Sequence, residues 1–218
     1  MIVETVTTTI NPDGSVNCAA MGVEWGDEEI VIKPYRATRT LRNLQATGAA
    51  VVNLTDDILL FAQAALEDPH PPTRPAASVD GAVLADACSW REVSVDAIDG
   101  DGPRASVRTR VVGRGTGREF IGFSRACHAV LEASILASRV RRLPAAEVRD
   151  ELARLAVVVD KTAGPRERAA MDTVMAHVRA ALGDGGPRSA SRRPPGCTWG
   201  CSTPPGRGRA GSAGSGWR

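Results

Sequence analysis

Residues 2–25 read IVETVTTTINPDGSVNCAAMGVEW, in which two β-branched segments flank the turn sequence NPDG at residues 11–14. Valine, isoleucine and threonine favour extended backbone, and a Pro-Asp-Gly turn between two such segments is typical of a hairpin. The stretch therefore predicts two antiparallel strands, residues 2–10 and 15–25. Residues 30–35, IVIKPY, follow the short turn GDEE and predict a third strand of the same meander.

The next segments alternate between helix and strand. Residues 39–48, RTLRNLQATG, predict a helix, with a threonine available as its N-cap and Gly48 as its C-terminal stop. Residues 49–57, AAVVNLTDD, predict a buried strand whose two aspartates cap a short helix beginning at Ile58. We expect a loop in the proline-rich sequence DPHPPTRP at residues 68–75.

The second half divides into strands and then helices. Residues 83–98 and 104–113 alternate between apolar and polar side chains, which indicates strands with one buried and one solvated face, as in an antiparallel barrel. Three helical segments follow, at residues 124–143, 144–159 and 164–182. Strands first and helices later favour an α+β fold over a βαβ repeat.

Charge and composition exclude several classes of protein. The chain has 218 residues, 27 basic and 25 acidic, and from residue 186 onward it carries six arginines and no acid. Removing these six leaves 21 basic against 25 acidic residues, so we expect no nucleic-acid binding by the folded part. No apolar run is long enough to span a membrane and the N-terminus lacks a basic region, so we expect a cytoplasmic protein.

The sequence KPYRATRT at residues 33–40 gathers hydrogen-bond donors just before a predicted helix. Arg36, Thr38, Arg39 and Thr40 could converge on a phosphate together with the free N–H groups of that helix. The same residues would also suit a solvated basic turn that only caps the helix. On these residues alone both interpretations stay open.

The sequence VNCAAMGV at residues 16–23 places Asn17 before a run of small side chains on the second strand. Small side chains would let a flat ring lie close to the backbone, although close packing inside a barrel would require them too. Other patterns point to no catalytic site. The glycine run VGRGTG matches neither the P-loop nor the dinucleotide-binding spacing, so we expect a turn at a strand end there. The three histidines are far apart and the five cysteines have no zinc-ligand spacing, so we expect no metal.

Taken together, GSVNCAAMGVEW, IVIKPYRATRTLRNLQATGAAVVNLTDDILLFAQAAL and FSRACHAVLEASILASRV resemble a DUF447-like family of uncharacterised archaeal and bacterial proteins. This family has the flavin-reductase-like, FMN-binding split-barrel fold, and the resemblance covers residues 2–182. It implies an antiparallel split β-barrel with a C-terminal helical segment. The expected parts are a barrel domain at 1–123, helices packed on it at 124–185, and a disordered Gly/Pro/Arg-rich tail at 186–218.

The resemblance also implies a cofactor and its ligands. It implies FMN held near the interface of a homodimer, with NAD(P)H as a candidate electron donor and a link to methanopterin-dependent one-carbon metabolism. Carried over residue by residue, the cofactor-binding set is Asn17, Ala19, Ala20 and Met21 at the ring, Arg36, Thr38 and Thr40 at the phosphate, with Asn53 and Thr55 on the neighbouring strand. Ala20 stands where the family has proline.

The implied activity is that of a flavin-dependent oxidoreductase, in which the protein fixes the flavin and the flavin carries the electrons. No catalytic side chain can be named from the sequence. Three alternatives remain: a non-catalytic flavin-binding module, binding of deazaflavin F420 or pyridoxal phosphate on the same fold, and nucleic-acid binding by the arginine-rich tail. For the tail we favour a non-functional extension over nucleic-acid binding.

Overall fold

The predicted hairpin begins a closed barrel. Strand β1(Ile2–Ile10) pairs antiparallel with β2(Val16–Trp25) along its whole length. Between them the Gly14 N–H donates to the carbonyl of Asn11 over 2.9 Å, and Gly14 takes φ of 81°, a left-handed conformation that suits glycine. This is the turn expected from NPDG.

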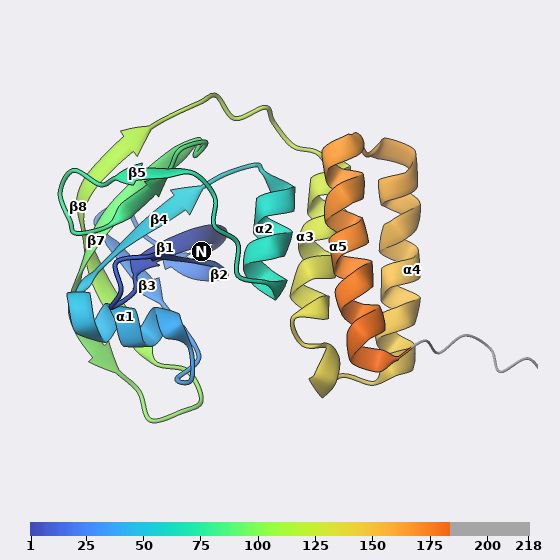
Figure 1. The fold of residues 1–218 in the computed structure, drawn as a ribbon, viewed down its shortest axis with the longest axis horizontal. Coiled ribbons are helices and arrows are strands. Elements are labelled where there is room, and N and C mark those ends of the chain that lie inside the picture. Colours follow the sequence, from blue (N-terminus) through green and yellow to red (C-terminus); the bar gives the residue numbers. More distant parts are fainter. Residues whose placement is uncertain (184–218) are drawn as a thin grey trace, which may run out of the picture. The chain divides into compact units, whose positions relative to one another are not determined.

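Six strands close the barrel, and the predicted α+β class with an antiparallel barrel is confirmed (Figure 1). The other four are β3(Glu29–Ile32), β4(Ala49–Leu54), β7(Ser89–Asp99) and β8(Ser106–Thr116). Their order around the barrel is β1, β2, β3, β8, β7 and β4, with β4 pairing back to β1. All of these pairs are antiparallel.

Helix α1(Arg39–Thr47) packs its apolar face against the barrel interior, where Leu41 and Leu44 join the buried core. Its ends are those expected from the sequence. The Thr38 hydroxyl accepts from the N–H of Leu41, and Gly48 ends the helix at φ of 65°.

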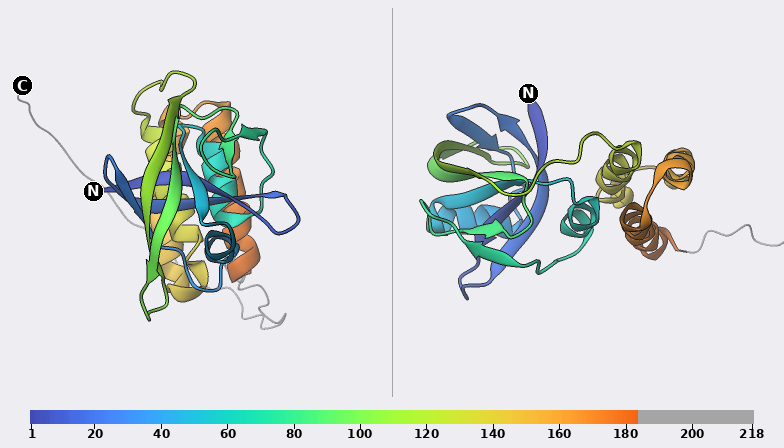
Figure 2. Two further views of the ribbon diagram at one scale, coloured as in Figure 1. Left: turned by 90° about the vertical axis from the view of Figure 1, so that its left-hand side faces the viewer. Right: turned by 90° about the horizontal axis from the view of Figure 1, so that it is seen from above.

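The remaining helices form a second layer outside the barrel. They are α2(Ile58–Leu66), α3(Arg125–Ala137), α4(Ala145–Thr162) and α5(Pro165–Leu182), with a single 3₁₀ turn η1(Val140–Arg142) after α3. Helix α2 lies between the barrel and the other three helices (Figure 2). A second apolar core joins the outer faces of β1, β2 and β4 to these helices.

The two aspartates before α2 fasten this layer to the barrel. Asp57 caps α2, as expected, by accepting from the N–H of Leu60 over 3.1 Å. It also binds the guanidinium of Arg166 on α5 through both carboxylate oxygens. Asp56 instead accepts from Arg118 and from the Ile121 N–H, and so holds the connection between β8 and α3.

Two features were not expected from the sequence. The proline-rich loop contains a short hairpin of β5(Thr73–Pro75) and β6(Ala82–Leu84). Strand β8 continues through the glycine run, where a turn was expected. Gly115 lies opposite Trp90, and a Cβ at Gly115 would come within 2.1 Å of the indole ring, so glycine there makes room for the ring.

The computed structural model describes residues 1–183, and the tail expected from residue 186 onward lies outside them. Among these residues, no helix is both long and apolar enough to cross a membrane.

The close approach of Gly115 to Trp90 predicts the effect of a single methyl group. Gly115→Ala should lower the free energy of unfolding by about 1–3 kcal/mol, because overpacking must displace the indole or the strand. Urea denaturation measures this. Gly102→Ala is the matched control, since nothing lies within 4 Å of its Cβ position. Equal stability of the two variants would contradict the tight packing of Gly115.

Candidate functional site

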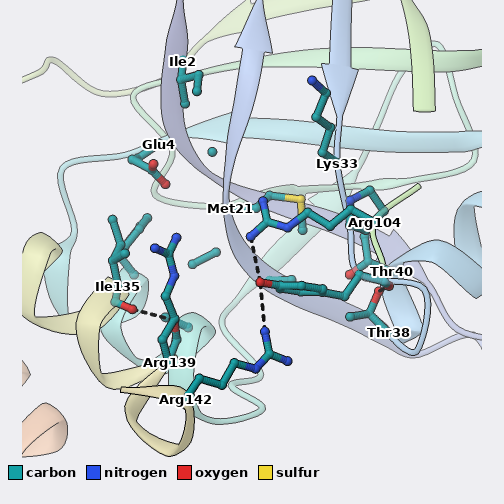
Figure 3. Close-up of a pocket in the computed structure, with 18 residues that line it drawn as sticks. Ile2, Glu4, Met21, Lys33, Thr38, Thr40, Arg104, Ile135, Arg139 and Arg142 are labelled. Carbon is teal, nitrogen blue, oxygen red and sulfur yellow. Dashed lines mark hydrogen bonds between the residues drawn. The ribbon is translucent and has the colours of Figure 1, made fainter. Parts of the chain in front are cut away.

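A cavity of about 490 Å³ lies between the barrel and the outer helices (Figure 3). Strands β1 and β2 and the segment from Lys33 to Thr40 form one side, and α2, α3 and η1 form the other. Arg104, from the loop between β7 and β8, completes it. The sequence segments that carry the family resemblance therefore meet at one place.

Small side chains on β2 form a wall of the cavity. Ala19, Ala20, Met21 and Gly22 all line it. A Cβ at Gly22 would come within 2.8 Å of a Glu4 carboxylate oxygen, so a side chain there would collide with Glu4. Glu4 therefore covers Gly22, while Ala19 and Ala20 give the cavity the small side chains that a flat ring would need.

The N-terminus of α1 meets the cavity through Thr38 and Thr40, two of the three expected phosphate ligands. The Thr38 hydroxyl donates to the Tyr35 carbonyl over 2.7 Å and accepts from the Leu41 N–H, so it is used within the turn. The Thr40 hydroxyl accepts from the Asn17 side-chain amide over 3.2 Å, which leaves its own proton to donate. The first N–H groups of a helix have no intrahelical acceptor and favour an anion.

Buried amides hold α1 in this orientation. The Thr9 hydroxyl accepts from the side-chain amides of Asn17 and Asn43, over 3.1 and 3.0 Å. Asn17 lies on β2 and Asn43 on α1, so one hydroxyl of β1 joins both elements. Asn17 therefore supports Thr40 from behind and is not itself part of the cavity lining.

Tyr35 lines the cavity and contacts two arginines, Arg104 and Arg142. Its hydroxyl accepts from Arg104 over 3.0 Å and from Arg142 over 3.1 Å. Both guanidinium groups also lie over its ring, at 4.3 and 5.0 Å from the centroid. The hydrogen bond from Arg104 holds the pKa of the Tyr35 phenol below its usual range, and Arg142 adds to this effect.

Glu4 brings a carboxylate to the same cavity, on the side facing Arg139 (Figure 3). Burial raises the pKa of Glu4, and the nearby charge of Glu132 adds to the increase, whereas Arg139 opposes it. The carboxyl therefore takes up a proton more readily than an exposed glutamate.

Besides Asn17, three more of the expected residues do not line this cavity. Arg36 is exposed, and its Nε donates to the carbonyl of Gly102 over 2.9 Å. Asn53 is fully buried, where its amide donates to the Val6 carbonyl and its oxygen accepts from the Leu84 N–H. Thr55 lines a different cavity of about 300 Å³, beside Asp57 and Arg166.

Sequence reasoning missed the cationic residues that surround Tyr35. Arg104 comes from the strand predicted at residues 104–113, and Arg139 and Arg142 from the end of a predicted helix. For Arg139 and Arg142 the sequence signal is their spacing in SRVRRL at residues 138–143, which places both on one side of a 3₁₀ turn. Arg104 has no such signal.

Other reactive side chains in the described part of the chain offer no second chemistry. Burial raises the pKa of Cys18 to about 12 and also raises the pKa of Cys88 and Cys127, so none of these thiols is activated. Within residues 1–183 no three histidine, cysteine or acidic side chains gather as a metal site would require. The tail cysteines at 197 and 201 lie outside these residues.

Two family models match nearly the whole described chain. The model "Protein of unknown function (DUF447) N-terminal domain" matches residues 3–118, and "Protein of unknown function (DUF447)" matches residues 124–176.

Solved structures with a similar fold include an FMN-bound protein of the DUF447 family from Methanosarcina mazei. It is 18% identical, with a TM-score of 0.71 over 81% of this chain and 94% of its own. Flavoredoxin from Methanosarcina acetivorans is 10% identical, with a TM-score of 0.49 over 56% of this chain and 72% of its own. The styrene monooxygenase flavin reductase from Pseudomonas putida S12 is 16% identical, with a TM-score of 0.46 over 52% of this chain and 79% of its own.

The arginines around Tyr35 predict a measurable titration, because Tyr35 is the single tyrosine of the chain. Its phenolate absorbance should appear below the usual pKa of about 10. Arg104→Gln removes a donor to the phenolate and should move the titration to higher pH. Ultraviolet difference spectra measure both.

The control for this titration is Arg110→Gln, an exposed arginine of β8 that pairs with Asp96. It should leave the titration unchanged. A Tyr35 titration that is the same with and without Arg104 would contradict the arrangement described here.

Proposed function

This chain belongs to the DUF447 family, and we propose that it binds FMN in the cavity between the barrel and the helices. We further propose that it acts as a flavin-dependent oxidoreductase of the flavin-reductase type. One observation carries the proposal: the same cavity joins a strand wall of small residues to a helix N-terminus with an arginine beside it. A flat ring with a phosphate needs both.

The phosphate has suitable donors at the start of α1. Thr40 offers a hydroxyl proton held in place by Asn17, and the helix adds N–H groups and the positive end of its dipole. Arg104 supplies a guanidinium on the same side, and its present partner is the neutral phenol of Tyr35. A phosphate would replace that partner with a charge-assisted hydrogen bond, which is stronger.

The ring has a suitable wall on β2. Ala19 and Ala20 present only methyl groups, so a planar group can approach the backbone there. Phe61 of α2 and Ile135 of α3 supply apolar surface in the same cavity. In this proposal the barrel holds the cofactor, and α2, α3 and η1 provide the facing wall.

When bound, FMN supplies reversible hydride and electron transfer. The chain's own part is to orient the ring, exclude water on the β2 side and hold the phosphate. Glu4 is the carboxyl that lines the cavity, and burial raises its pKa above that of an exposed glutamate. NAD(P)H is the electron donor we propose, and a link to methanopterin-dependent one-carbon metabolism belongs to the same proposal.

Bleaching of bound flavin by NAD(P)H without oxygen separates this proposal from its alternative. An oxidoreductase should lose the flavin absorbance and regain it when oxygen is admitted. Retention of FMN without bleaching by either nicotinamide would favour a flavin-binding module that does not turn over. Stronger thermal stabilisation by F420 or pyridoxal phosphate than by FMN would identify that ligand as the cofactor instead of FMN.

We also propose a homodimer, supported by apolar surface on the connection between β8 and α3. Phe120, Ile121 and Phe123 are 50%, 89% and 90% exposed, and exposed apolar clusters of this kind favour association. Light scattering should give twice the mass of one chain, and Phe123→Ser should shift the mass toward the monomer. A wild-type chain that is monomeric at all concentrations would contradict this.

The phosphate seat predicts which arginine matters for FMN. Arg104→Ala should weaken FMN binding by about tenfold or more, because it removes a charge-assisted hydrogen bond. The same variant should leave the affinity for riboflavin, which lacks the phosphate, nearly unchanged. Fluorescence quenching of each flavin on titration with protein measures both dissociation constants.

Arg36→Ala and Arg42→Ala complete the comparison. Arg36 is the arginine that the sequence favoured, and Arg42 is exposed on α1 with its guanidinium donating to the Ala37 carbonyl. Because neither lines the cavity, both should bind FMN like the wild type. Weaker FMN binding in Arg36→Ala together with unchanged binding in Arg104→Ala would place the phosphate site at Arg36, as expected from the sequence.

A further inference from the structure

We propose that Arg139 and Arg142 form a second anion site in the cavity, which binds the phosphate or carboxylate end of a second small molecule beside the flavin. The placement beside the flavin rests on the proposed FMN site. The anion site itself rests on the arrangement of charge in the cavity, which can be tested without FMN.

The cavity holds more positive charge than one phosphate requires. Four cationic side chains line it, namely Lys33, Arg104, Arg139 and Arg142, against one carboxylate, Glu4. Lys33 is already paired with Glu24 on β2, and Arg104 is assigned above to the FMN phosphate. Arg139 and Arg142 are left on the opposite wall, at the end of α3.

Neither of these two arginines is neutralised by the described residues. Among residues 1–183, no carboxylate lies within 4.0 Å of either guanidinium, although other arginines form nine such contacts and Lys33 forms one. Arg142 donates to the neutral Tyr35 hydroxyl. The facing carboxyl of Glu4 has a raised pKa, which weakens it as a counter-charge.

The local backbone gives the two arginines a common direction. Arg139 precedes the 3₁₀ turn η1 and Arg142 ends it, and side chains three residues apart in a 3₁₀ turn lie one above the other. Both line the cavity, whereas Arg141 between them does not. The turn thus separates two arginines that face the cavity from one that does not.

Like charges crowd around Tyr35, since Arg104 and Arg142 both donate to one phenol oxygen. Guanidinium groups so placed repel one another, and an anion bound by Arg142 together with Arg139 offsets part of that positive charge. The site lies at the C-terminal end of α3, where the helix dipole disfavours an anion. Binding there must depend on the arginine side chains, so removing one should have a large effect.

The test uses the full chain at low ionic strength, where exposed charges are least screened. Pyrophosphate, NADPH and citrate are titrated into the protein by calorimetry, with and without bound FMN. Wild-type protein should bind at least one of them at a single site. Preference for pyrophosphate and NADPH would indicate a phosphorylated ligand, and preference for citrate a carboxylated one.

The variant Arg139→Gln should weaken the binding of that anion by at least about tenfold and change the FMN dissociation constant by less than about twofold. Arg141→Gln is the matched control and should bind the anion like the wild type. Equal effects of the two variants, or no anion binding by the wild type, would overturn the proposal.

A parallel loss of FMN and anion affinity in Arg139→Gln would also overturn it, because Arg139 would then belong to the FMN phosphate site. Because anion binding is also measured without FMN, failure of the anion site can be told apart from failure of the proposed FMN site. A chain that binds the anion through Arg139 but never binds FMN would contradict the proposed function alone.

Discussion

The hydroxyl of Thr9 joins the helix at the cavity to the hairpin that starts the barrel. It accepts from Asn17 on β2 and from Asn43 on α1, and Asn17 in turn donates to Thr40. All four side chains are buried, so replacing Thr9 would remove the acceptor that both amides share, at a cost of about 1–3 kcal/mol. This network turns the N-terminus of α1 toward the cavity, and the proposed phosphate site depends on that direction.

The facing wall of the cavity depends on a different set of contacts. Helix α2 packs between the barrel and the outer helices, and Asp57 ties its start to Arg166 on α5. Asp56 holds the connection that leads into α3 through Arg118 and the Ile121 N–H. Arginines at the end of α3 therefore reach a barrel loop that is distant in sequence. The cavity exists only where the two layers meet.

The sequence predicted well those features that neighbouring residues determine. The hairpin, the Thr38 and Gly48 ends of α1, the Asp57 cap and the small residues of β2 all follow from local rules of turn, cap and packing. Ala19, Ala20, Met21, Thr38 and Thr40 are also found together in the cavity, because the motifs that contain them are joined by one strand and one turn.

The features that were missed depend on contacts between distant segments. Arg36 follows the expected motif, yet the turn directs it to the Gly102 carbonyl, which no local rule specifies. Arg104 and Arg142 contact Tyr35 from positions 69 and 107 residues away in the sequence. Asn53 lies on the strand that was expected, but its amide is used to hold β1 and β6.

The central claim is that the cavity between barrel and helices holds FMN. The most direct measurement is to purify the chain, release any bound small molecule by heat and identify it by chromatography and mass. The account predicts a yellow protein that releases FMN, or a colourless one that takes up one FMN per chain and gains thermal stability from it. A protein that neither carries FMN nor is stabilised by it would contradict the account.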